Sequence, residues 1–139
     1  MNHSTITGNT SGWGGGAYQS TLNNCIIYGN SSYDHAGCTI NYSCTTADPF
    51  APSGTGNITN DPQFVDAAAG DYRLKMNSPC LDAGNNAYVV GTTDLDGNPR
   101  IVNGIVDMGA YEGPHALPEL AIIPANTNLS YKAANGVTL

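Results

Sequence analysis

The sequence predicts an all-β protein built as a short parallel β-solenoid, followed by a closing segment and an extended tail. Three observations predict this fold: a composition rich in turn-forming residues, an internal repeat in the first half, and a change of character from Gly56 onward. Charged residues make up only 11% of the 139 residues, and 17 residues are glycine. Glycine and asparagine tolerate the left-handed backbone conformations of tight turns, so this composition favours short strands joined by many turns.

The internal repeat appears in two alignments of the first half. "MNHSTITGN" (residues 1–9) aligns with "LNNCIIYGN" (residues 22–30), and "TLNNCIIYG" (residues 21–29) aligns with "TINYSCTTA" (residues 39–47). Each unit holds one β-branched strand flanked by Asn and Gly, and it lacks the 3.6-residue apolar rhythm of a helix. A parallel solenoid explains the repeat because equivalent residues of successive coils then stack on one another.

The stacked positions predict columns of like side chains. The apolar columns should point inward: Met1, Leu22 and Ile40 in one, Ile6 and Ile27 in the other. The amides of Asn2, Asn23 and Asn41 should form an asparagine ladder at a turn, each bonding to the next coil. Aromatic residues also gather in or beside the repeats. Trp13 could be an exposed platform for sugar stacking, although it more often covers nearby apolar surface. Four tyrosines could line a binding face, although ordinary packing on the sheet exterior is the favoured interpretation: Tyr18, Tyr28, Tyr33, Tyr42.

The second half of the sequence differs from the first in its strand pattern and its acidic residues. It has two short apolar strands, around Phe64-Val65 and Tyr72–Leu74, and it holds most of the acidic residues between Asp61 and Glu112. The organisation predicted from these changes is three segments: β-helix coils in residues 1–55, the last coil and C-terminal cap in 56–113, and a linker with the start of a further β module or a swapped tail in 114–139.

Charge and hydropathy exclude several partners. The formal net charge is −7, with four Lys and Arg against eleven Asp and Glu. A chain this poor in cations cannot neutralise a phosphate backbone, so nucleic acid is excluded as a partner. No apolar window is long enough to insert into a membrane, and "MNHSTITGN" lacks the basic and apolar parts of a signal peptide.

Three motifs of the second half resemble a known family. "NITNDPQFVD", "DYRLKMNSPCLDAG" and "DLDGNPRIVNGIVDMGAYE" follow, in that order, the C-terminal signature of bacterial right-handed parallel β-helix proteins. These are large secreted or surface proteins of the pectate-lyase-like superfold, often of the choice-of-anchor, polymorphic outer-membrane or adhesin-like kind. The resemblance implies the last coils and end-cap of a right-handed solenoid, from an extracellular or cell-surface parent whose earlier coils are cut off here. It implies little about activity, because the superfold hosts enzymes and inert adhesins alike.

The predicted function is a non-catalytic scaffold or adhesin-type module that contacts a glycan or a protein surface. No lysine or arginine precedes Arg73, and the only acids of the repeats are Asp34 and Asp48, so the residues that a polysaccharide lyase or hydrolase needs are missing and no catalytic residue is predicted. The alternative is the C-terminal part of a carbohydrate-active β-helix whose catalytic coils lie upstream.

The stretch "DLDGNPRIVNGIVDMGAYEG" allows two site hypotheses. No cofactor is required by the predicted function. The stretch nevertheless begins like a calcium loop, so its carboxylate and amide oxygens could hold a calcium ion: Asp94, Asp96, Asn98, Asp107, Glu112. Alternatively, Arg100 is a structural lock that pairs with Asp107 or Asp82 in a partly buried ion pair. The lock is favoured, because a buried guanidinium beside the acids would compete with a cation.

Two further expectations concern links within and between chains. The resemblance implies that Cys44 and Cys80 lie close together and could form a disulfide between the last repeat and the cap. The first coil should expose Met1, Ile6 and unpaired strand edges, which predicts a homodimer formed through this open end, or coverage of the end by the chain's own tail with its apolar run at residues 120–123.

Overall fold

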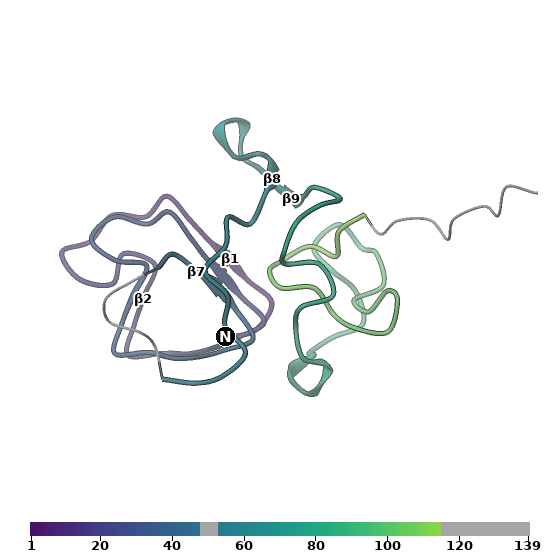
Figure 1. Ribbon diagram of the computed structural model, residues 1–139, viewed down its shortest axis with the longest axis horizontal. Coiled ribbons are helices and arrows are strands. Elements are labelled where there is room, and N and C mark those ends of the chain that lie inside the picture. Colours follow the sequence, from purple (N-terminus) through teal and green to yellow (C-terminus); the bar gives the residue numbers. More distant parts are fainter. Residues whose placement is uncertain (48–52, 115–139) are drawn as a thin grey trace, which may run out of the picture.

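The computed structural model describes residues 1–47 and 53–114, and it is all-β with parallel strands in small sheets (Figure 1). This confirms the all-β part of the predicted fold class, whereas the right-handed solenoid stays a prediction. In the part of the chain described, no helix is long and apolar enough to cross a membrane. Two regions are distinguished below: the repeat region, residues 1–58, and the acidic region, residues 61–113. The predicted tail beyond residue 114, including the run at 120–123, lies outside the described residues.

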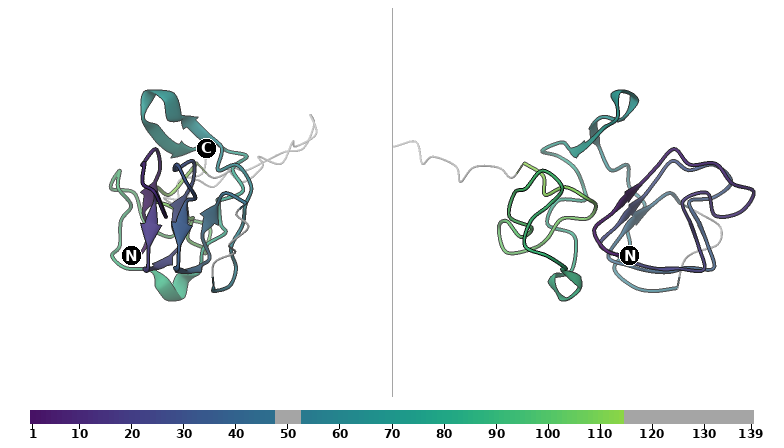
Figure 2. Two further views of the ribbon diagram at one scale, coloured as in Figure 1. Left: turned by 90° about the vertical axis from the view of Figure 1, so that its left-hand side faces the viewer. Right: turned by 180° about the vertical axis from the view of Figure 1, so that it is seen from behind.

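The largest sheet of the repeat region has three parallel strands in the order β1-β4-β7, with β1 pairing Ile6 against Ile27 of β4. A parallel bridge from Cys44 to Ile58 continues the same pairing by one more segment. Successive segments of the chain thus follow similar paths, one beside the next (Figure 2). The strands are β1 (Thr5–Ile6), β4 (Ile26–Ile27) and β7 (Cys44–Thr45).

Two further pairs of parallel strands complete the repeat region. The register pairs Leu22 with Ile40 and Asn23 with Asn41, as the sequence alignment predicts. Nδ2 of Asn23 donates to Oδ1 of Asn2 at 3.0 Å, and Nδ2 of Asn41 donates to Oδ1 of Asn23 at 2.9 Å. The amides therefore form a continuous chain across three segments. The strands are β2 (Ala17–Tyr18) with β5 (His35–Ala36), and β3 (Thr21–Asn23) with β6 (Thr39–Asn41).

A left-handed residue follows each of these asparagines. His3, Asn24 and Tyr42 have φ values of 49°, 51° and 47°. They occupy equivalent positions of the repeat, and each turns the chain from one sheet towards the next. Asparagine adopts this conformation more readily than most residues with a side chain. The recurrence at one position shows that the turn is part of the repeat.

The strand β4 separates two apolar clusters. Ile27 lies in the cluster enclosed by the repeat region, together with Leu22 and Ile40, whereas Ile26 lies in the cluster shared with the acidic region. Adjacent residues of a strand point to opposite faces, which places the two isoleucines in different cores. The prediction for Met1 is wrong in part, because its side chain is 67% exposed. Its carbonyl pairs with the next segment, but nothing in the described residues covers its outer side.

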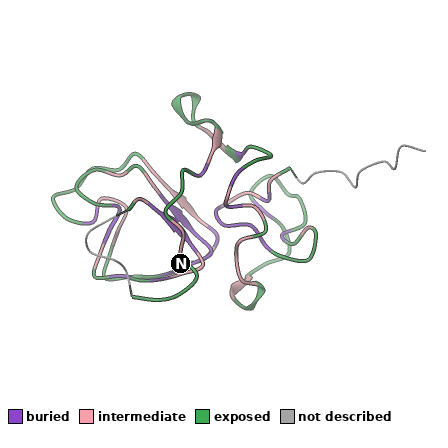
Figure 3. Ribbon diagram, viewed as in Figure 1, coloured by how far each residue is buried: buried purple, intermediate pink, exposed green. Residues whose placement is uncertain are grey.

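The acidic region contains an antiparallel hairpin and long irregular loops. The hairpin pairs Phe64 with Leu74, so both strands predicted in this region are confirmed. The apolar residues Leu74, Cys80 and Met108 of the acidic region pack with Ile26 on the outer face of the β1-β4-β7 sheet. Buried residues are concentrated along this boundary (Figure 3). The elements of the acidic region are β8 (Phe64–Asp66), β9 (Asp71–Leu74), and the single-turn 3-10 helices η1 (Ala67–Ala69) and η2 (Asn86–Tyr88).

Asn24 joins the two regions. Its fully buried amide donates to the carbonyl of Asn85 at 2.9 Å and accepts from the N–H of Asn85 at 2.8 Å. Its own carbonyl accepts from the N–H of Gly109 at 2.8 Å. Three hydrogen bonds from one left-handed corner therefore fix the acidic region against the repeat region.

Candidate functional site

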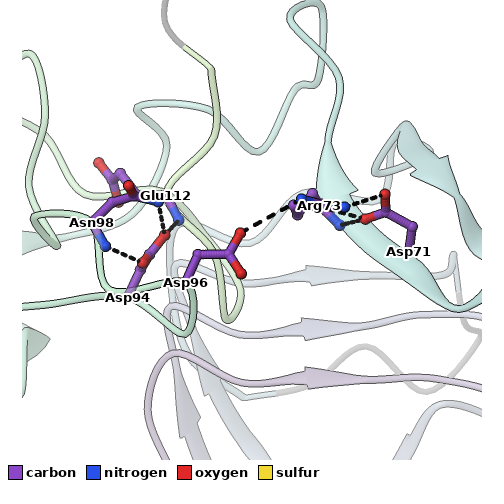
Figure 4. Close-up of polar contacts among 6 residues, drawn as sticks. All are labelled: Asp71, Arg73, Asp94, Asp96, Asn98 and Glu112. Carbon is purple, nitrogen blue, oxygen red and sulfur yellow. Dashed lines mark hydrogen bonds and ion pairs between the residues drawn. The ribbon is translucent and has the colours of Figure 1, made fainter.

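The residues Asp94 to Asn98 form a tight turn closed by the Asp94 carboxylate (Figure 4). This carboxylate accepts from the backbone N–H of Asn98 at 2.7 Å, from the Asn98 amide at 3.2 Å and from the N–H of Glu112 at 2.9 Å. Burial acts to raise the pKa of Asp94, but these hydrogen bonds outweigh it and hold the pKa below its usual value. The group is thus an ionised acceptor that ties the turn to the end of the region.

Asp107 and Glu112 bind backbone N–H groups in the same way. The two oxygens of Asp107 accept from the N–H groups of Asp82 and Gly113, each at 2.6 Å. Those of Glu112 accept from the N–H of Val102 at 3.0 Å and of Asp107 at 3.2 Å. Both side chains are buried. The three carboxyl groups together tie distant loops of this irregular segment.

The predicted calcium ligands differ in their surroundings. Asp96 and Asn98 are exposed, whereas the oxygens of Asp94, Asp107 and Glu112 face backbone N–H groups. Within residues 1–47 and 53–114, no group of three or more His, Cys, Asp or Glu side chains is placed to hold a metal ion. A calcium loop and this turn both use Asp and Gly to bend the chain, and calcium binding at these residues stays a prediction.

The burial predicted for Arg100 as a structural lock is confirmed, and its pairing with Asp82 or Asp107 stays a prediction. The side chain is 6% exposed, but Nη1 donates to the carbonyl of Gly109 at 3.3 Å and Nη2 to that of Ala110 at 3.1 Å. The guanidinium therefore supplies donors to two consecutive backbone carbonyls of the acidic region.

His3 lies beside Arg100 at the edge between the two regions. A pocket of about 470 Å³ opens there, lined by both residues and by Asn2. Burial, and secondly the nearby Arg100 charge, lower the pKa of His3 to about 4, against the opposing effect of a hydrogen bond with the Tyr88 backbone. His3 is consequently neutral at physiological pH.

A cleft of about 740 Å³ separates the β8–β9 hairpin from the Asp94–Glu112 loops. Its ionisable lining residues are Asp71, Arg73, Asp96 and Glu112 (Figure 4). Arg73 donates to both oxygens of Asp71 at 2.8 Å, and its Nη1 lies 3.9 Å from Asp96. The hydrogen bonds from Arg73 lower the pKa of the Asp71 carboxyl, and those with Asp71 raise the pKa of Arg73. Asp71 and Arg73 are therefore both charged at neutral pH, so the pair can orient a polar ligand but is poorly tuned for proton transfer.

Cys44 and Cys80 lie in the same apolar cluster between the two regions. Both are free thiols here, so the disulfide implied by the resemblance is not formed in this structure. A hydrogen bond with Cys80, and secondly burial, raise the pKa of the Cys44 thiol. Cys44 also donates to the carbonyl of Asn60 at 3.2 Å. A neutral, buried thiol is a poor nucleophile, which favours a packing role.

Sequence reasoning overlooked Asp34 and Asn24. Asp34 is fully buried in the repeat region, where its carboxylate accepts from the N–H groups of Asn30 and Thr46, both at 2.8 Å. The available signal was an acid in a repeat region that has no lysine or arginine, because a buried carboxylate there must find hydrogen-bond donors. Asn24 carried no comparable signal, since its partner Asn85 is distant in the sequence.

The chain has no match among protein-family models or among curated proteins. The likeness to bacterial β-helix proteins therefore rests on the three sequence motifs, and the parallel pairing of the repeat region is compatible with it.

Proposed function

We propose that the chain forms the last turns and the closing segment of a right-handed parallel β-solenoid, and that it acts as a non-catalytic scaffold or adhesin-type module of a secreted or cell-surface bacterial protein. The observation that carries this proposal is the parallel register of β1, β4 and β7, extended to Ile58. Equivalent residues stack across successive segments, as they do in solenoid proteins. The acidic region covers the outer face of this sheet.

The polar groups of the acidic region support a structural role. Asp94, Asp107 and Glu112 are buried and accept backbone N–H groups, so they serve to hold loops in place. A general acid or base needs a pKa near the working pH and access to a substrate. The lowered pKa of Asp94 and its burial fit neither requirement.

An assay for turnover tests the proposal. The purified chain is incubated with neutral and uronate-containing polysaccharides, with and without millimolar calcium, and new reducing ends and unsaturated uronate products are measured. The proposal predicts no product above a heat-denatured sample. Product that forms with the chain and disappears in an Arg73→Gln variant would overturn the non-catalytic role.

The alternative is a contribution to a carbohydrate-active β-helix, and the cleft beside Arg73 is the observation that favours it. Its volume and its mixture of charged and apolar lining residues suit part of a polysaccharide. In this case Arg73→Gln should weaken binding of a uronate-containing polysaccharide, while Lys75→Gln, outside the cleft lining, should not.

We also propose that the chain self-associates as a homodimer through its first strands. β1 lies at the edge of its sheet, and a groove of about 480 Å³ at this end is lined by apolar residues that include Met1, Ile6 and Leu22. An edge strand with exposed apolar neighbours favours pairing with another chain. Light scattering should give a dimer that dissociates in a Met1→Lys, Ile6→Lys double variant. A wild-type monomer at all concentrations contradicts this pairing.

A further inference from the structure

Exposed aromatic side chains gather on the repeat region. Trp13 is 66% exposed, Tyr18 is 59% exposed and Tyr33 is 41% exposed. The rings of Trp13 and Tyr33 lie 6.4 Å apart, centroid to centroid, and are tilted by 35°. Trp13 and Tyr18 line an open groove of about 750 Å³ together with Ser11, Gly12 and Gly14. We call this feature the aromatic groove.

The backbone around the aromatic groove is held firmly. The N–H of Gly15 donates to the carbonyl of Tyr33 at 2.8 Å, and the Ser11 hydroxyl donates to the carbonyl of Trp13 at 2.9 Å. A Cβ atom at Gly15 would lie 2.4 Å from the carbonyl oxygen of Ser31, so only glycine allows this close approach. The loop that carries Trp13 is therefore braced by backbone hydrogen bonds and by the close approach at Gly15.

Packing against the apolar clusters does not explain the positions of the Trp13 and Tyr18 rings. Tyr28 and Tyr42 pack against the apolar cluster between the two regions, whereas Trp13 and Tyr18 belong to neither buried cluster. An exposed tryptophan on a braced loop forgoes the free energy that burial of its ring would provide. Tryptophan and tyrosine in such positions are typical of binding surfaces.

The lining of the aromatic groove indicates the charge of its ligand. Ser11, Gly12, Trp13, Gly14 and Tyr18 carry no ionised side chain, and the sequence has no lysine or arginine before Arg73. An ionised ligand would lose hydration here without gaining a counter-charge, which disfavours anionic polysaccharides and phosphates. The groove instead offers aromatic faces beside hydroxyl and peptide groups, which suits an uncharged ligand with one apolar and one polar side.

We infer that the aromatic groove binds a neutral glycan, with a sugar ring stacked on Trp13 and flanked by Tyr18. The C–H groups on one face of a neutral hexose or pentose form an apolar surface, and its rim of hydroxyls can bond to Ser11 and to the peptide groups of the loop. This inference deepens the proposed scaffold or adhesin role by naming a site and a ligand class. It rests on that role only for the expectation that the bound glycan is not cleaved.

Trp13 is the sole tryptophan of the chain, so its fluorescence reports on the groove directly. The chain is titrated with neutral cello-, xylo-, manno- and malto-oligosaccharides, with oligogalacturonate as the anionic comparison. At least one neutral series should shift and saturate the Trp13 emission, with affinity that rises with chain length and is insensitive to salt. Oligogalacturonate should produce no saturable change.

Variants separate stacking from folding, with affinity measured by calorimetry. Trp13→Ala should weaken binding of the neutral oligosaccharide about tenfold or more, and Tyr18→Ala by about threefold to tenfold. Trp13→Phe should retain part of the affinity, because it keeps an aromatic face. Val90→Ala, at an exposed apolar residue of the acidic region, is the matched control and should bind like the wild type.

Three outcomes would overturn the inference: no neutral series changes the Trp13 emission, the anionic probe binds as well as the neutral ones, or the emission responds only to protein concentration. The last would identify a second copy of the chain as the occupant of the groove. None of these results bears on the turnover assay. Conversely, product formation there would remove the non-catalytic role and leave glycan binding at Trp13 intact.

Discussion

The repeat region and the acidic region satisfy their buried backbone in different ways. In the repeat region, parallel strands bond to one another and the side chains form apolar and amide columns. The acidic region has one short hairpin and long loops, and its buried N–H groups are bound by the carboxylates of Asp94, Asp107 and Glu112. A regular backbone supplies its own acceptors, whereas an irregular one needs them from side chains.

The comparison gives the acidity of the second half a physical role. Eleven Asp and Glu residues in a chain with four Lys and Arg could indicate a surface made for cations. Three of them are instead buried in the acidic region as hydrogen-bond acceptors, and Asp34 does the same in the repeat region. The charges therefore contribute to the interior as well as to the surface.

The largest expected effect is the loss of the Asp107 carboxylate. Asp107→Ala leaves the N–H groups of Asp82 and Gly113 without these acceptors, and it should lower the free energy of unfolding by about 3–5 kcal/mol. Urea unfolding followed by circular dichroism measures the change. Asp96→Ala is the control, because its side chain is exposed and contacts Arg73 only at 3.9 Å. It should change stability by less than about 0.5 kcal/mol.

Two neighbouring isoleucines distinguish the two cores. Ile27→Ala should cost about 3 kcal/mol by leaving a cavity inside the repeat region, and Ile26→Ala a similar amount. Ile26 also packs against Gly109, where an added Cβ would lie 2.8 Å from its Cδ1. Hydrogen exchange at the N–H of Gly109 should therefore speed up more in Ile26→Ala than in Ile27→Ala. Equal acceleration would mean that the regions unfold as one unit.

Two neighbouring asparagines give a smaller contrast. Asn24→Ala removes both bonds to Asn85 and places alanine at a positive φ, so it should destabilise the chain by about 2–3 kcal/mol. Asn23→Ala removes two amide bonds of the partly buried column and should cost about 1–2 kcal/mol. Thermal unfolding ranks the two variants, and Asn77→Ala at an exposed position provides the baseline. A larger effect for Asn23 would contradict the joining role of Asn24.

The repeat region was largely predictable from the sequence and the acidic site was not. Aligning Leu22 with Ile40 and Asn23 with Asn41 predicted the observed register, because positions that stack in a repeat are occupied by similar residues. The strands near Phe64 and Tyr72 were visible as apolar runs between turn residues. The hydrogen bonds from Arg100 to the carbonyls of Gly109 and Ala110 could not be predicted, because every residue has a backbone carbonyl and the sequence does not indicate which one is used.

A further effect, which depends on pH, is an acid-sensitive contribution from His3. Its pKa of about 4 in the folded chain lies below the usual value of 6.5, so the unfolded chain binds the proton first as pH falls. Stability should therefore decline by about 2 kcal/mol between roughly pH 6.5 and 4. Asp94, with its lowered pKa, adds a further loss only in more acidic solution, as pH falls through its folded value. His3→Asn, which keeps the left-handed corner, should flatten the upper part of the curve.

The most direct test of the division between the two regions is site-resolved hydrogen exchange in Asp107→Asn. The amide retains one acceptor oxygen in place of two, so at least one of the N–H groups of Asp82 and Gly113 loses its bond. Exchange at these two sites should accelerate by about tenfold or more, a loss of ~1.4 kcal/mol. The ladder N–H groups of Ile26 and Cys44 should keep their wild-type rates. Equal acceleration at all four sites, or none at Asp82 and Gly113, would contradict the claim that buried carboxylates hold the acidic region locally.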